Sequence, residues 1–311
     1  MPRRHGTQTA VAGRSGMLSV SLSAILLSVG CGIGFAAADY FRKAVPASCP
    51  TPVVLFYFVG GQLPILLVWL LWSGETRLTA AYWLPGLLDV AAGLAANLMF
   101  IAAVRRSPLS LMIPVLALVP VVTAGAGAAV LGEVPSPGQI GGTLLIVAGL
   151  FAVYMPGDGR ASAAAAWGAM RREPGLPLML GTTLGWSVTP VLDKLCVAAA
   201  SVPMHGTIQV AAIWLVTGAW VAARYGWRGL APPPGSALPL AGGAVAASLG
   251  YGLQLAAYQA TLVALAEGLK RVTGLLAALA VGRIMFGEPV TRPKTIGVAV
   301  LAVGVPLILL S

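Results

Sequence analysis

The chain has 311 residues, of which 58% are hydrophobic and only 9% are charged, and its mean hydropathy is +0.89. Soluble domains carry about 25% charged residues, so this composition excludes an ordinary water-soluble protein and predicts a protein surrounded by lipid. The net charge of +10 does not indicate nucleic-acid binding, because the basic residues are scattered singly and in pairs between apolar runs. A nucleic-acid binder would gather them on one face or in a tail.

Few residues offer metal-binding or nucleophilic chemistry. Cys31, Cys49 and Cys196 lie in or beside apolar segments without metal-like spacing, which predicts buried, inert thiols. The two histidines are His5, in the polar N-terminal tail, and His205, which the apolar runs place in a loop. We therefore expect no metal site, no cofactor and no Ser–His–Asp apparatus.

Apolar runs recur along the chain at the length of a membrane-spanning helix, about 20 residues. In chain order the expected spans are 17–38, 53–72, 82–104, 109–131, 138–155, 177–199, 207–223, 237–258, 262–282 and 295–310. The first run mimics a secretory signal, but it exceeds the apolar core of about 7–15 residues that such signals have, so an uncleaved helix is expected. The predicted fold class is an all-α integral membrane protein with ten transmembrane helices.

An internal repeat divides these spans into two sets of five. LGEVPSPGQIGGTLLIVAG (131–149) is echoed by FGEPVTRPKTIGVAVLAVG (286–304), with their Gly-Glu pairs 155 residues apart. Asp39 matches Asp193 at an offset of 154. Because five is odd, the second copy must enter the membrane from the opposite side, which predicts inverted repeats. Such repeats place a substrate site near the bilayer midplane and rock to give alternating access.

The repeat sets the predicted domain organisation. Residues 1–16 form a polar, basic N-terminal tail, and 17–155 form the first five-helix repeat. Residues 156–176 are a linker, and 177–311 form the second five-helix repeat.

Two stretches resemble a known family. ALAEGLKRVTGLLAALAVGRIMFGE (264–288), with its Lys-Arg pair, small-residue helix and Phe-x-Glu, looks like the ninth helix of the EamA-like branch of the drug/metabolite transporter superfamily. PLSLMIPVLALVPVVTAGAGAAVLGE (108–133) is similar to the matching fourth helix. The resemblance covers about residues 17–311 and implies a transporter fold, with substrates drawn from amino acids, sugars, drugs and other metabolites. Asp89 matches no motif of the family.

The loop charges give an expectation for orientation. Loops after odd-numbered spans carry twelve Lys and Arg residues, and the opposite side carries four. Positive loops favour the cytoplasm, so this bias favours termini outside, whereas the family resemblance favours cytoplasmic termini. Both orientations stay open at this point.

Three charges lie inside the ninth span. Glu267, Lys270 and Arg271 are related as i, i+3 and i+4, so they share one helix face. A Lys or Arg facing lipid at the bilayer centre costs about 2.5–3.5 kcal/mol on insertion scales, so this face must point into the bundle or a wet cavity. Two interpretations remain: a buried ion-pair cluster that fixes helix packing, or an electropositive floor of the substrate cavity.

Other polar residues within spans are further candidates, because each carries a desolvation cost. They would contact substrate, or bond structurally to neighbouring helices. The complete predicted substrate-binding set is Glu267, Lys270, Arg271, Asp89, Asn97, Trp186, Gln62, Gln254 and Tyr258. Trp186 lies beside Pro190, which loosens the backbone and suits a cavity wall.

Four charged residues near helix ends are expected to lie outside this site. Glu133 and Glu288 close their helices beside proline-containing loops and are interpreted as structural. Asp193 and Lys194 close the sixth span and are interpreted as interfacial.

The favoured function is transport of a small metabolite or amphipathic drug across the cytoplasmic membrane, as an exporter. The chain contains no GxxxxGK[ST] phosphate loop, so ATP is not the direct driver. Transport would be coupled to protons through Asp89 or Glu267, or facilitative. The alternatives are a structural or lipid-translocating membrane subunit and, less favoured for want of histidines and interfacial carboxylates, an integral membrane enzyme. The low lysine content, 4 against 15 arginines, favours a GC-rich bacterial source.

Overall fold

A computed structural model of the chain describes residues 21–46, 48–107, 113–153, 171–232, 234–286 and 292–310. Within these ranges the regular structure is helical, and one isolated β-bridge joins Leu78 to Ala200. The elements are α1 (Leu22–Ala44), α2 (Thr51–Gly60), α3 (Leu63–Ser73), η1 (Ala80–Tyr82), α4 (Trp83–Arg106), η2 (Ile113–Leu118), α6 (Val119–Leu131), α7 (Pro137–Val153), α9 (Leu176–Ala199), α10 (Val202–Tyr225), η3 (Trp227–Leu230), α11 (Ala237–Ala260), α12 (Val263–Phe286) and α13 (Arg292–Leu310).

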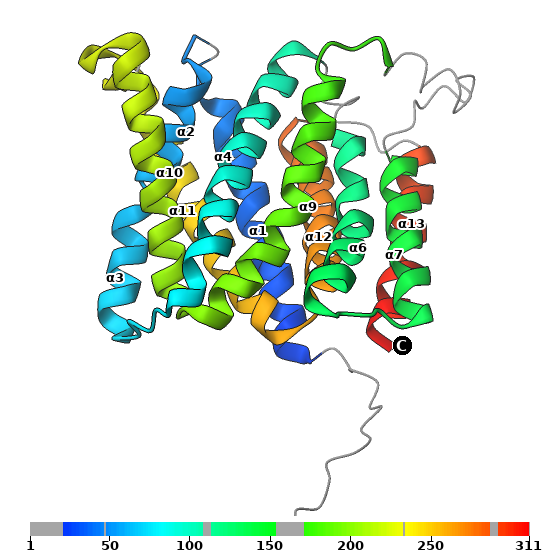
Figure 1. Ribbon diagram of the computed structural model, residues 1–311. Coiled ribbons are helices and arrows are strands. Elements are labelled where there is room, and N and C mark those ends of the chain that lie inside the picture. Colours follow the sequence, from blue (N-terminus) through cyan, green and yellow to red (C-terminus); the bar gives the residue numbers. More distant parts are fainter. Residues whose placement is uncertain are drawn as a thin grey trace, which may run out of the picture.

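The helices stand side by side in one bundle (Figure 1). Five segments of the described residues are long and apolar enough to cross a membrane: Leu22–Arg42, Thr51–Ser73, Ala80–Ala103, Val202–Tyr225 and Ala237–Ala260. Large apolar side chains such as Leu71, Trp72 and Leu84 are exposed on their outer faces. A surface of this kind suits hydrocarbon and not water. The chain is therefore a multi-pass membrane protein.

The expected span 53–72 is broken in the middle. Helix α2 ends at Gly60 and α3 begins at Leu63, because Pro64 has no N–H to donate to the carbonyl four residues earlier. The side chain of Gln62 bridges the break by donating from Nε2 to the Phe58 carbonyl, at 2.9 Å. The expected fourth span likewise begins, in its described part, as the 3₁₀ segment η2 before it continues as α6.

The helix contacts arrange the bundle. Helix α1 packs mainly against α11 and α12, and α9 packs mainly against α4 and α6. Helices α7 and α13 lie together at one edge, while α2, α3 and α10 form the opposite edge (Figure 1). The chain runs in opposite directions along α1 and α9 (Figure 1).

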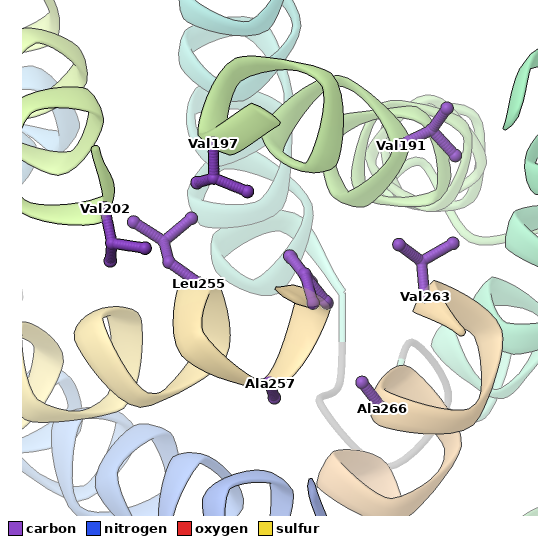
Figure 2. Close-up of a cluster of buried hydrophobic side chains, with 8 residues drawn as sticks. Val191, Val197, Val202, Leu255, Ala257, Val263 and Ala266 are labelled. Carbon is purple, nitrogen blue, oxygen red and sulfur yellow. The ribbon is translucent and has the colours of Figure 1, made fainter. Parts of the chain in front are cut away.

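Apolar side chains from four helices close the centre of this bundle. Val191 and Val197 of α9 meet Leu255 of α11 and Val263 of α12, with Val202, Ala257, Tyr258 and Ala266 in the same cluster (Figure 2). All of these residues are buried. The cluster holds α9, α11 and α12 beside one another, which is where the polar residues of the next section meet.

Helices α7 and α13 approach closely enough for their backbones to touch. A Cβ atom on Gly149 would lie 2.9 Å from the carbonyl oxygen of Gly297, and one on Gly304 would lie 3.1 Å from that of Gly142. Such distances leave no room for a side chain. Small residues at contacts of this kind let membrane helices pack tightly, where van der Waals contact replaces the hydrophobic effect.

Gly149→Ala is therefore expected to lower the thermal stability of the detergent-purified protein. The added methyl group overpacks the α7–α13 contact, at a cost of about 1–3 kcal/mol. Gly125→Ala in α6 is the matched control, since a Cβ atom there meets nothing within 4 Å. It should leave stability unchanged or raise it by up to about 1 kcal/mol. Equal melting temperatures for both variants would contradict the close approach.

Candidate functional site

Glu267 of α12 is fully buried and lies at the centre of a cluster of charges. The hydroxyl group of Tyr258 donates to its Oε1 at 2.6 Å, and the Lys270 ammonium group donates to the same oxygen. The Arg271 guanidinium Nη2 lies 3.8 Å from Oε2. Two buried atoms of this cluster, Glu267 Oε2 and Arg271 Nε, have no hydrogen-bond partner among the described residues.

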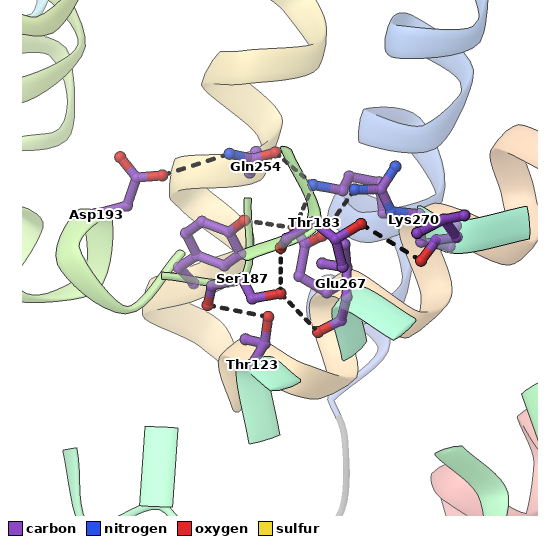
Figure 3. Close-up of polar contacts among 11 residues, drawn as sticks. Thr123, Thr183, Ser187, Asp193, Gln254, Glu267 and Lys270 are labelled. Atoms are coloured by element: carbon purple, nitrogen blue, oxygen red, sulfur yellow. Dashed lines mark hydrogen bonds and ion pairs between the residues drawn. The ribbon is translucent and has the colours of Figure 1, made fainter. Parts of the chain in front are cut away.

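The cluster continues across α11 to α9 through Gln254. Lys270 Nζ donates to Gln254 Oε1 at 2.8 Å, and Gln254 Nε2 donates to Asp193 Oδ2 at 3.5 Å. Figure 3 shows these side chains turned toward one another from three helices. One amide side chain therefore connects the positive Lys270 to a second acidic group. Sequence reasoning selected both Gln254 and Lys270 but not Asp193, to which Gln254 donates.

Asp193 forms the next part of the network with His205 and Asp89. His205 Nε2 lies 2.9 Å from Asp193 Oδ1 and 4.0 Å from Asp89 Oδ2. The other ring nitrogen, Nδ1, lies 3.1 Å from the Tyr82 hydroxyl group. Asp89, Asp193 and His205 are all buried, and their ligand atoms lie within 4.8 Å of one another.

Two sequence expectations are wrong here. His205 was expected in a loop, but α10 begins at Val202, five residues before the expected span, and this places the imidazole inside the bundle. Asp193 was expected at the interface, but its carboxylate is buried between helices. The signal that was missed is Pro203. Proline is favoured in the first turn of a helix, so α10 can begin at Val202 and include residues 202–206.

The sequence predicted no metal site, but three residues that could bind a metal ion lie together in the structure. Asp89, Asp193 and His205 offer two carboxylate oxygens and one imidazole nitrogen at mutually compatible positions. The three residues belong to α4, α9 and α10. Their sequence spacing matches no metal motif, so only the folded chain reveals the group.

Aromatic rings flank the two cations. The Arg271 guanidinium carbon lies 5.6 Å from the centre of the Trp186 ring, and Lys270 Nζ lies 5.5 Å from that of Phe35. Trp186 in turn packs against Phe100, with ring centroids 4.9 Å apart. Cation–π contacts at these distances stabilise positive charge in a desolvated position.

Pro190 interrupts the hydrogen bonding of α9 beside this site. The Thr123 hydroxyl group of α6 donates to the Ser187 carbonyl at 3.2 Å, and the Ser187 hydroxyl group donates to the Thr183 carbonyl at 2.6 Å (Figure 3). Side chains of α6 and α9 therefore satisfy backbone groups near the proline, as membrane helices require.

Two of the predicted site residues bond within their own segments. Asn97 Nδ2 donates to the Gly93 carbonyl at 2.8 Å, and Gln62 bonds to the Phe58 carbonyl as described above. Of the predicted set, the network of described side chains contains Glu267, Lys270, Arg271, Gln254, Tyr258 and, through His205, Asp89.

Glu133 occupies a different position, at the start of α12. Its Oε1 pairs with Lys194, and its Oε2 accepts from the backbone N–H of Val263 at 3.1 Å. Lys194 also donates to the Thr261 carbonyl at 2.8 Å. The pair joins α6, α9 and the N-terminus of α12, where an anion is favoured by unsatisfied N–H groups. Its predicted counterpart, Glu288, lies outside the described residues.

Glu133→Ala is expected to lower thermal stability measurably. It removes the ion pair with Lys194 and the carboxylate that accepts from the Val263 N–H at the start of α12. Hydrogen bonds to charged groups contribute about 1.5–3 kcal/mol. Asp39→Ala is the control: that side chain is 54% exposed and pairs only with Arg42 among the described residues, so about 1 kcal/mol or less is at stake. If Glu133→Ala is as stable as Asp39→Ala, Glu133 does not have the predicted structural role.

Comparisons with known proteins agree with this architecture. Residues 20–155 match the sequence model of the EamA-like transporter family. A solved crystal structure shares the fold, with a TM-score of 0.73 at 16% sequence identity, over 93% of this chain and 96% of that one. No curated protein matches the sequence.

These observations define the class first: the described residues form a multi-pass membrane protein built of helices. Residues 20–155 match the EamA-like transporter family, which belongs to the drug/metabolite transporter superfamily. This match confirms the family resemblance found in the sequence over residues 20–155.

Proposed function

We propose that the chain moves a small metabolite or amphipathic drug across the cytoplasmic membrane by alternating access, as an exporter. The observation that carries this proposal is the pair of unpartnered buried atoms, Glu267 Oε2 and Arg271 Nε. Buried polar atoms are nearly always hydrogen-bonded, so an acceptor and a donor that both lack a hydrogen bond are suited to binding a ligand or water. Transport is secondary active with protons as the coupling ion, or facilitative.

Alternating access rests on the proposal of ten spans in two inverted repeats, 17–155 and 177–311, joined by the linker 156–176. The helix contacts support it. In the proposed repeat α1 corresponds to α9 and α11 corresponds to α4, and the structure packs α1 against α11 and α9 against α4. The α7–α13 contact supports it further. Gly304 and Gly297 lie 155 residues after Gly149 and Gly142, respectively. The contact of Gly149 with Gly297 in one direction therefore corresponds to the contact of Gly304 with Gly142 in the other.

The charges of the site favour anionic or zwitterionic solutes. Lys270 and Arg271 outnumber Glu267 by one positive charge, and Glu267 already accepts from Lys270. Arg271 is the freer cation, since it approaches Glu267 only to 3.8 Å. We propose that Trp186 and Tyr258 line the same cavity and that Asp89, Gln254, Asn97 and Gln62 belong to the wider solute pathway.

Lys270→Ala and Arg271→Ala are each expected to insert and purify normally yet lose transport, with anionic or zwitterionic solutes most affected. Loss of one charge-assisted contact of about 1.5–3 kcal/mol lowers solute affinity about 10- to 100-fold. A tolerance screen of cells overexpressing the chain against cells lacking it identifies the solute. Flux into proteoliposomes, with and without a pH gradient, then measures each variant. Arg42→Ala, at a half-exposed ion pair, is the matched control.

The outcomes separate the two interpretations of this charged cluster. If Lys270→Ala and Arg271→Ala both transport at the wild-type rate, the charged cluster does not form part of the substrate cavity. Failure of both variants to accumulate in the membrane favours a purely structural ion-pair cluster. A dependence of wild-type flux on the pH gradient supports proton coupling, and its absence supports facilitation.

The loop charges predict termini outside the cytoplasm, and reporter fusions at Ser311 test this. A periplasmic phosphatase fused there should be active, because the excess of Lys and Arg lies in loops on the other side. Fluorescence of a cytoplasmic reporter together with an inactive phosphatase would establish the opposite orientation.

A further inference from the structure

We propose that Asp89, Asp193 and His205 form a binding site for a divalent transition-metal ion such as Zn²⁺ or Co²⁺. The site is distinct from the charged cluster of Glu267, and it does not rest on the transport function. Three helices that are far apart in the sequence, α4, α9 and α10, each contribute one ligand.

The ligand geometry suits such an ion. His205 Nε2 lies 2.9 Å from Asp193 Oδ1 and 4.0 Å from Asp89 Oδ2, and all three ligand atoms fall within 4.8 Å. Zn²⁺ binds histidine nitrogen and carboxylate oxygen at about 2.0–2.2 Å, so its ligand atoms lie about 3–4 Å apart. Small side-chain rotations bring the three atoms onto one coordination sphere. Imidazole with carboxylates favours Zn²⁺, Co²⁺ or Ni²⁺ over Mg²⁺ and Ca²⁺.

The charge of the cluster also calls for a cation. Two carboxylates lie in a buried position, and among the described residues their ion pairs are with His205 alone. The nearby cations are engaged elsewhere: Lys194 pairs with Glu133, and Lys270 pairs with Glu267. Buried charges in proteins are paired or coordinate metals, because their desolvation is otherwise uncompensated. A divalent ion would neutralise both aspartates at once.

The surroundings hold the ligands in a metal-binding orientation. The Tyr82 hydroxyl group lies 3.1 Å from His205 Nδ1. With an ion bound, an Nδ1–H that donates to this oxygen would leave the Nε2 lone pair for the metal. Asp193 receives hydrogen bonds from Tyr251, at 3.4 Å, and from Gln254, at 3.5 Å. Metal-binding histidines almost always donate their second ring N–H to such a partner, and ligating carboxylates are hydrogen-bonded in turn.

A surface pocket lies at the N-terminal end of α10, the helix that carries His205. It has a volume of about 490 Å³ and is lined by residues that include Arg77, Ser201, Val202 and Gln259. The backbone N–H of His205 donates to the Ser201 carbonyl at 2.9 Å, so the imidazole begins one helical turn below the pocket lining.

Metal binding to the purified full-length protein tests the site directly. The protein is prepared in detergent without a polyhistidine tag, stripped with a chelator, and equilibrated with Co²⁺ or Zn²⁺. We expect one ion per chain by elemental analysis after gel filtration, a visible Co²⁺ absorption band, and a melting temperature raised by Zn²⁺. Asp89→Asn and Asp193→Asn should each lower the affinity at least about 10-fold. Tyr82→Phe, which changes a positioning residue, should lower it about 10- to 100-fold.

Two controls exclude adventitious binding. His5→Gln removes the other histidine, and Asp39→Asn removes an exposed carboxylate; both should bind Co²⁺ as the wild type does. Wild-type binding no stronger than that of the Asp89→Asn/Asp193→Asn double variant overturns the proposal, as does binding lost in His5→Gln. If an aspartate variant fails to fold, Tyr82→Phe decides, since an unchanged Co²⁺ affinity and absorption band there contradict the site. A wild type that binds no metal also overturns the proposal.

Discussion

The burial of Glu267 is the constraint on which much of this structure depends. A carboxylate without solvent inside an apolar helix is tolerated only with partners within reach. Tyr258 and Lys270 supply them on one oxygen. Tyr258 of α11 bonds to Glu267, and Lys270 bonds to Gln254 of α11, so both contacts tie α12 to α11. In this arrangement Arg271 faces Trp186 of α9. Packing and polar satisfaction therefore impose the same arrangement on three helices.

From this point polar contacts extend through the bundle in one connected path. Lys270 bonds to Gln254, Gln254 to Asp193, and Asp193 to His205, which approaches Asp89. The path joins helices of both halves of the chain. In a low-dielectric interior each such contact is stronger than in water, and each unmade contact is more costly. Of these contacts, the approach of His205 to Asp89, at 4.0 Å, is the one that reaches α4 in the first half, so the proposed movement of one half against the other would act on this contact.

The two polar centres differ in character. Around Glu267 the cations are in excess, and two atoms lack partners among the described residues. Around His205 the carboxylates are in excess, and the arrangement is enclosed by Tyr82, Tyr251 and Gln254. The first centre is suited to a solute that carries negative charge, the second to a small cation. Gln254 touches both, so a change at either centre reaches the other through a single side chain.

Composition and periodicity determined that this is a helical membrane protein and gave the positions of most of its helices. They also selected Glu267, Lys270 and Arg271, because charge in an apolar run is visible from spacing and insertion cost alone. The grouping of Asp89, Asp193 and His205 was decided only by the tertiary structure. These residues lie on α4, α9 and α10, and no local pattern encodes which helices become neighbours. A five-residue error in the start of α10 also hid the histidine, since helix boundaries depend on packing that the sequence does not display.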